Sequence, residues 1–191
     1  MSTHGQTRPR ETEAVPTPGV GIDRVPAMAC IVLTQCAEAL AAFDDARYTA
    51  PAPDGSGGTV GKHVRHALDH FCALLEQPED AIDYDRRDRG VPVETDKGAA
   101  VREIDRLAAL ASGLHEVDLY REVTILAMLD GSGSTARLPS TLGRELFFAV
   151  HHAIHHHAMI HALAHGLGVS LPAGFGKAPS TLDHERRCGG S

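Results

Sequence analysis

The helical spacing of apolar residues is the feature that most constrains the fold of this chain. Between residues 59 and 77, apolar side chains recur at intervals of four and three positions. They are Val60, Val64, Leu68, Phe71 and Leu75. This is the period of an α-helix, so these side chains share one face. Thr59 precedes the stripe and is a favoured residue type for a helix N-cap. The pattern predicts an amphipathic helix that packs against other helices.

Three further stretches, 27–47, 94–113 and 139–165, are also predicted to be helices of about 20 residues. Between the last two, apolar residues alternate within 117–138, and the turn sequence DGSG follows at 130–133. Alternation ending in such a turn predicts a small β-hairpin before the last helix. Aromatic residues make up only 4% of the chain, while alanine and leucine dominate, which favours helix. We therefore predict an all-α four-helix bundle with one inserted hairpin.

The length of 191 residues predicts a single domain with tails. Residues 1–25 are polar and rich in Pro and Gly, so we expect a disordered leader. The bundle domain is predicted to span 26–182. Its last part, 171–182, has no helical period and is expected to cross the bundle as ordered coil. A flexible tail is expected over 183–191.

The charge of the chain excludes some partners. Lys and Arg number 18 against 25 Asp and Glu, for a net charge of −7. An acidic chain is a poor counterion for phosphate, so we expect no nucleic-acid partner and no binding to an anionic membrane. The apolar runs are well short of the roughly 20 residues that a spanning helix needs. The polar N-terminus lacks the apolar core of a secretion signal, which predicts a cytoplasmic protein with free thiols.

Histidine is the unusual component of the sequence. The chain has 13 histidines, and most of them fall in two of the predicted helices. The helix at 59–77 contains three, and the helix at 139–165 contains seven. They are His63, His66 and His70, then His151, His152, His155, His156, His157, His161 and His165. Imidazoles are typical ligands of zinc, nickel, iron and copper, so the clusters indicate a metal site between two helices.

Helical geometry selects among these side chains. His152 and His156 are four residues apart and lie one above the other on a face that also contains apolar residues. Such a pair can chelate one ion, although the HExxH motif is absent. A third ligand must come from the helix at 59–77, and periodicity alone does not decide which. The angle around the helix slightly favours His63 or His70. We expect the remaining histidines of the last helix, including His157, to lie at the surface or rim.

Several segments together resemble the DinB/YfiT-like metalloprotein superfamily. TVGKHVRHALD (59–69) is similar to the S-I-G and H-L-A-D motifs of that superfamily, and HAIHHHAMI (152–160) is similar to its H-x-x-H-H motif. Together with these motifs, the segments IDYDRRDR, STLGREL and FGKAPSTL resemble one uncharacterised branch of the superfamily. The resemblance implies an up-down-down-up bundle with three histidines on a divalent metal, either Zn, Ni or Fe. Position by position, those ligands are His66, His152 and His156.

Other residues near the ion are candidates for supporting roles. His63 and His155 become candidates for alternative ligands or for side chains that support the ligands. Glu145 lies two turns before His152 and is a candidate base or hydrogen-bond acceptor. Tyr84, Arg86 and Arg144 are the candidates for orienting a substrate.

Three imidazoles leave positions open on an ion, so the first functional hypothesis is a metal-dependent enzyme. Members of the superfamily include thiol-dependent transferases, and hydrolases have been proposed. We therefore expect a hydrolase or a thiol S-transferase that acts on a small molecule, with a thiol as one candidate. Two alternatives stay open. One is a non-catalytic metal-binding protein, such as a sensor or stress protein. The other is a bundle without metal whose role is dimerisation; a homodimer is compatible with all three hypotheses.

Overall fold

The computed structural model of the chain describes residues 21–53, 55, 57–76, 80–86 and 90–189. Most of the predicted leader, residues 1–20, and the end of the predicted tail, residues 190–191, therefore lie outside the described residues.

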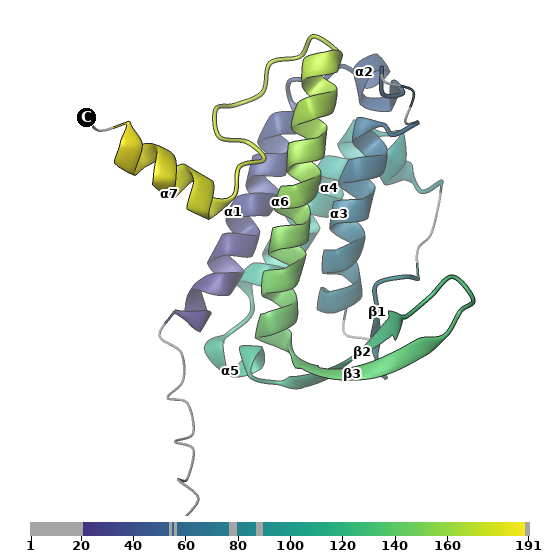
Figure 1. Cartoon of the computed structure of the whole chain (residues 1–191), viewed down its shortest axis with the longest axis vertical. Coiled ribbons are helices and arrows are strands. Elements are labelled where there is room, and N and C mark those ends of the chain that lie inside the picture. Colours follow the sequence, from purple (N-terminus) through teal and green to yellow (C-terminus); the bar gives the residue numbers. More distant parts are fainter. Residues whose placement is uncertain (1–20, 54, 56, 77–79, 87–89, 190–191) are drawn as a thin grey trace, which may run out of the picture.

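Four long helices form the body of the protein (Figure 1). Their bounds are α1 (Val25–Leu40), α3 (Val60–Leu75), α4 (Lys97–Ser112) and α6 (Leu142–Gly166). Helix α6 packs against α3 and α1, and α4 packs against the same two helices. The predicted apolar stripe of α3 is confirmed, because all five of its residues are buried in the common core. None of the described helices is long and apolar enough to cross a membrane.

Shorter helical segments precede or connect the long ones. They are η1 (Ile22–Arg24), α2 (Asp45–Thr49), η2 (Pro92–Glu94) and α5 (Glu116–Leu119). The prediction of one continuous helix over 27–47 is wrong, since α1 ends at Leu40 and α2 begins at Asp45. The side chain of Asp44 accepts a hydrogen bond from the Arg47 backbone N–H at 2.7 Å. This N-cap starts a new helix at Asp45, so the stretch 27–47 is divided into two helices.

A three-stranded sheet lies at one end of the helices (Figure 1). Its strands are β1 (Ile82–Asp83), β2 (Glu122–Met128) and β3 (Thr135–Thr141). Strand β2 pairs in parallel with β1 and antiparallel with β3. The antiparallel pair of β2 and β3 overlaps the later part of the region 117–138, where alternation predicts a hairpin. It extends beyond that region to Thr141, which is the N-cap of α6. The alternation gave no sign of β1, because two residues are too few to show a period.

Gly61 permits a close approach at the start of α3. A Cβ atom at this position would overlap the backbone carbonyl group of Glu94 in η2 and would lie 2.9 Å from the Tyr48 ring. The hydroxyl of Tyr48 donates to the carbonyl of Val93 at 2.6 Å, and Arg65 pairs with Glu94 at 2.8 Å. Segment η2 is therefore held directly against the first turn of α3. This contact gives a physical reason for glycine in the TVG motif.

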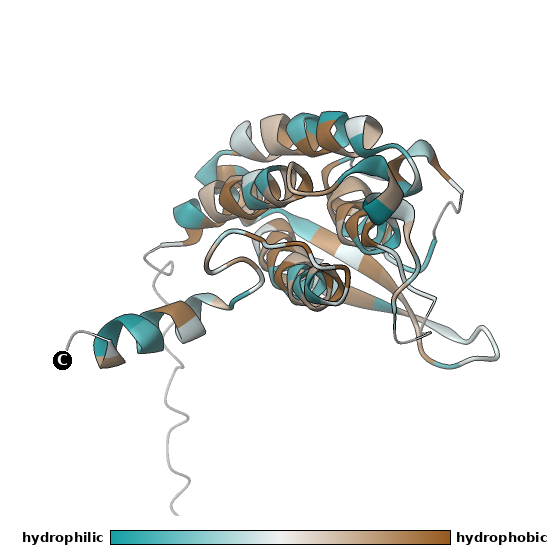
Figure 2. Ribbon diagram, turned by 90° about the horizontal axis from the view of Figure 1, so that it is seen from above, coloured by the Kyte–Doolittle hydropathy of each residue, from teal (hydrophilic) through white to brown (hydrophobic). Residues whose placement is uncertain are grey.

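The C-terminal region differs from its prediction. Residues 179–188 form helix α7 (Pro179–Cys188), whereas coil was expected up to residue 182 and a flexible tail beyond it. Proline at the first turn suits a helix start. The helix contains mostly polar residues, none of them buried, so the sequence has no apolar period there. It projects away from the four long helices (Figures 1 and 2).

Candidate metal centre

The histidines of α3 and α6 meet where these two helices pack against each other. Both helices begin at a threonine N-cap: Thr59 accepts from the Lys62 N–H at 3.1 Å, and Thr141 accepts from the Arg144 N–H at 3.3 Å. The helical repeat then turns one set of imidazoles on each helix towards the other. Five rings come together. They are His63, His66, His70, His152 and His156.

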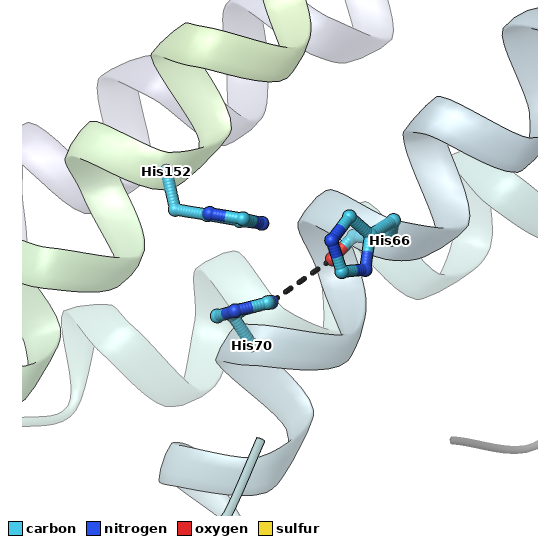
Figure 3. A group of neighbouring side chains, drawn as sticks. All are labelled: His66, His70 and His152. Atoms are coloured by element: carbon cyan, nitrogen blue, oxygen red, sulfur yellow. Dashed lines mark hydrogen bonds between the residues drawn. The ribbon is translucent and has the colours of Figure 1, made fainter. Parts of the chain in front are cut away.

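His66, His70 and His152 form a group that could hold a metal ion. One ring nitrogen from each lies within 4.8 Å of the others. Figure 3 shows the ring of His70 lying against that of His152, with His66 facing both. The centroids of His70 and His152 are 3.7 Å apart, at an interplanar angle of 24°. The predicted ligands His66 and His152 are thus adjacent, and the structure adds His70 to them.

His156, the third ligand implied by the family resemblance, lies beside the same group. Its ring centroid is 4.6 Å from those of both His66 and His152. Its Nδ1 is 3.1 Å from the Nδ1 of His63, so one of these nitrogens donates and the other accepts. Burial, with the nearby imidazoles of His152 and His66 as further causes, lowers the pKa of His156 to about 3. Burial also lowers the pKa of His63. Neutral imidazoles are the form that binds metals.

Glu145 and Tyr84 connect to this cluster through His70. The Glu145 side chain is only 1% exposed and accepts hydrogen bonds from the hydroxyls of Tyr84 (2.9 Å) and Ser140 (2.6 Å) and from the Arg144 guanidinium (2.6 Å). The Tyr84 ring stacks on His70 with centroids 4.9 Å apart and an interplanar angle of 13°. Burial, with Glu145 as the second cause, raises the pKa of Tyr84. Tyr84 is therefore a neutral hydrogen-bond donor that holds His70 in place.

The remaining predicted residues lie at or beyond the edge of the cluster. His155 is exposed, with its ring centroid 5.3 Å from that of His156. The side chain of Arg144 is 67% exposed, and its guanidinium lies 5.7 Å from the centroid of the Phe148 ring. Arg86 lines a different hollow, next to Asp69 and Glu103. The structure therefore brings Tyr84, Glu145 and Arg144 together and places Arg86 apart from them.

His157 is buried, which corrects the expectation that it lies at the surface or rim. Its side chain is 2% exposed and stacks on Phe175 of the coil after α6, with centroids 4.6 Å apart. Gly176 allows this coil to approach, since a Cβ there would lie 2.7 Å from the backbone nitrogen of Ala158. Only the fold reveals this contact, because residues 171–182 have no period that would indicate which side of α6 they cover.

The buried His157 leads to a prediction about acid stability. Burial lowers its pKa to about 4, whereas an unfolded histidine titrates near 6.5. The unfolded chain therefore binds more protons between these values, and folding loses free energy as the pH falls from about 6.5 towards 4. Between pH 7 and pH 5, we expect metal-free wild type to lose about 2 kcal/mol more unfolding free energy than His157→Asn. Urea titrations at both pH values measure this difference. Equal losses in the two proteins would show that His157 does not titrate in this way.

The fold and the histidine cluster together define a class: helical bundle proteins with a potential metal centre between two helices. No protein-family model matches the chain. The chain is similar in structure to YfiT from Bacillus subtilis, described as a probable metal-dependent hydrolase with an unusual four-helix bundle topology. The TM-score is 0.55 at 23% identity, over 87% of this chain and 96% of YfiT. The chain therefore shares its fold with YfiT, in line with the resemblance of its sequence motifs.

A curated protein, FK506-binding protein 5 of Rhizopus delemar, matches part of the sequence. The two are 39% identical over 107 residues, which make up 56% of this chain. The matched region spans only 28% of the fungal protein. The match therefore relates this chain to one portion of a longer protein.

Proposed function

We propose that the chain is a divalent-metal-dependent enzyme, a hydrolase in the first instance, whose ion is held by His66, His152 and His156. One observation carries this proposal: imidazoles from α3 and α6, far apart in the sequence, converge in a partly buried cluster. The likeness to YfiT, itself described as a probable metal-dependent hydrolase, supports it. The metal is proposed to be Zn, Ni or Fe.

The residues of the cluster fit a divalent ion. Several imidazoles gathered within reach of one ion are a typical donor set for such ions. When bound, an ion with an open position acidifies a water molecule or accepts a substrate thiolate. The chain supplies the surroundings: His63 contacts His156, and the buried Glu145 holds Tyr84 against His70. Such contacts orient ligands and restrict the access of water.

The same groups suggest how a substrate is held. The exposed guanidinium of Arg144, next to Glu145, could bind an anionic group at the edge of the cluster. We propose a small-molecule substrate with such a group, with a thiol-dependent S-transfer as the alternative reaction. The up-down-down-up order of the helices, a cytoplasmic location and a homodimer are proposed with the same function.

Metal analysis of purified, untagged protein tests this proposal. We expect about one ion per chain for wild type and a loss of most bound metal in His66→Ala, His152→Ala and His156→Ala, because each variant removes one of three ligands. Removing a supporting contact alone costs about 10–100-fold in affinity, so a lost ligand is expected to cost more. Elemental analysis after gel filtration gives the stoichiometry.

His151→Ala is the matched control, since His151 is on the same helix but exposed, with its ring against Phe147. It is expected to retain the ion. Stoichiometric metal in all three ligand variants would contradict the assigned site. Several weakly bound ions that survive His66→Ala would instead favour the non-catalytic metal-binding protein, since α6 also has exposed histidines such as His161 and His165.

A further inference from the structure

His70 is placed differently from an ordinary core histidine. It is 4% exposed and lies one turn after His66 on α3. Its Nδ1 is 3.1 Å from the backbone carbonyl oxygen of His66. A carbonyl oxygen only accepts hydrogen bonds, so Nδ1 of His70 must be the donor. The neutral ring then has its lone pair on Nε2.

This hydrogen bond is the arrangement that metal-bound histidines typically show. A ligating imidazole usually donates its second N–H to a backbone carbonyl or a carboxylate, which fixes both the tautomer and the orientation of the ring. His70 already donates such a hydrogen bond, to the backbone carbonyl of His66 in the same helix. The ring is also held on both faces, by His152 at 3.7 Å and by Tyr84 at 4.9 Å between centroids. His70 is therefore preorganised to offer Nε2.

The place of His70 among the other imidazoles matches the role. His70 belongs to the group of three whose ligand atoms lie within 4.8 Å of one another, together with His66 and His152. His156 contacts the rings of His66 and His152 as well, with centroids 4.6 Å from each. His66 and His152 thus adjoin both His70 and His156, so these four imidazoles, two from each helix, belong to one cluster. We propose that His70 is a fourth histidine ligand of the metal ion, an inference that rests on the proposed metal site.

A fourth imidazole ligand changes which metal ions would keep a coordination position open for a reaction. Four protein ligands fill the tetrahedral coordination of Zn²⁺, as in structural zinc sites. Ni²⁺ and Fe²⁺ accept five or six ligands and would keep a position open. The site would therefore hold Zn²⁺ in a closed state and would leave room for water or substrate on Ni²⁺ or Fe²⁺.

Nitrogen-15 NMR of the histidine side chains tests the ligand count directly. The full-length chain, labelled at histidine, is compared without metal and with one equivalent of Zn²⁺. We expect four imidazoles to show metal-bound nitrogen shifts, and one of these signals to disappear in His70→Gln. The exposed His151→Gln is the control and is expected to keep all four. Three metal-bound imidazoles in wild type, with His70 unchanged, would overturn the proposal. No metal-bound imidazole at all would instead refute the proposed function.

A second variant separates a ligand from a packing residue. His70→Phe keeps an aromatic ring between His152 and Tyr84 but has no nitrogen. If His70 is a ligand, both His70→Phe and His70→Gln lose more Zn²⁺ affinity than the 10–100-fold typical of a lost supporting contact. Near-wild-type affinity in His70→Phe would show that the ring only supports His152 and would refute the proposal. Competition with a chromogenic chelator measures the affinity, and circular dichroism confirms that each variant is folded.

Discussion

Metal binding is expected to raise the Tm of this protein by about 8–16 °C. A ligand that binds only the folded state, at a free concentration about 1,000 times its Kd, adds about 4 kcal/mol to the unfolding free energy. Each kcal/mol shifts Tm by about 2–4 °C for a chain of this size. The proposed ligands come from two helices, so the complete site exists only in the folded chain. Differential scanning calorimetry with Zn²⁺ or Ni²⁺, buffered by a competing chelator, measures the shift.

The double variant His66→Ala, His152→Ala is the control for this shift. It removes one imidazole from each helix and leaves the exposed histidines of α6 in place. Its Tm is expected to change little when metal is added. An equal rise in the double variant would show that the ion acts elsewhere, for example on the exposed histidines, and would contradict the assigned centre.

Replacing Gly61 by alanine is expected to destabilise the protein by about 3 kcal/mol, at the upper end of overpacking effects. Intrinsic helix propensity alone predicts the opposite sign, since alanine is favoured over glycine by about 1 kcal/mol inside a helix. Here the added methyl group would overlap the backbone of Glu94, and backbone atoms cannot move aside as a flexible side chain can. We expect Tm to fall by about 6–12 °C. Thermal unfolding followed by circular dichroism measures the change.

Gly113→Ala provides the comparison for Gly61. Gly113 follows α4, and a Cβ there would meet its neighbours at ordinary contact distances of 3.5 and 3.7 Å. This variant is expected to be close to wild type in stability. A neutral or stabilising effect of Gly61→Ala would mean that η2 is not held against α3 as the structure shows.

Sequence patterns predicted the main helices because each long helix hides one face in the core. The α3 stripe is the clearest case, with Thr59 at the predicted cap and all five apolar residues buried. Composition and periodicity also predicted the mostly helical fold. Elements without a period could not be found in this way. Strand β1 is too short to alternate, and α7 buries no residue.

The sequence predicted which two helices form the candidate site, but it did not predict which side chains contact one another there. Spacing on α6 and α3 identified the two helices, and the superfamily motifs selected His66, His152 and His156. The roles of these three residues remain predictions. The angle around α3 slightly favoured His63 or His70, but the family motif pointed to His66. Angle alone does not show that both rings reach the same place, since this depends on how closely α3 and α6 pack.

The sheet bears on how a molecule could reach the imidazoles. Tyr84, which covers one face of His70, directly follows β1, and β1 joins the sheet through only two residues, Ile82 and Asp83. Strand β3, in contrast, pairs with β2 along seven residues and leads straight into α6. Separating β1 from β2 breaks far fewer hydrogen bonds than moving either helix. Opening at Tyr84 would therefore uncover His70 while both helices that supply the imidazoles stay in place, at the cost of the Tyr84–Glu145 hydrogen bond and the burial of Ile82.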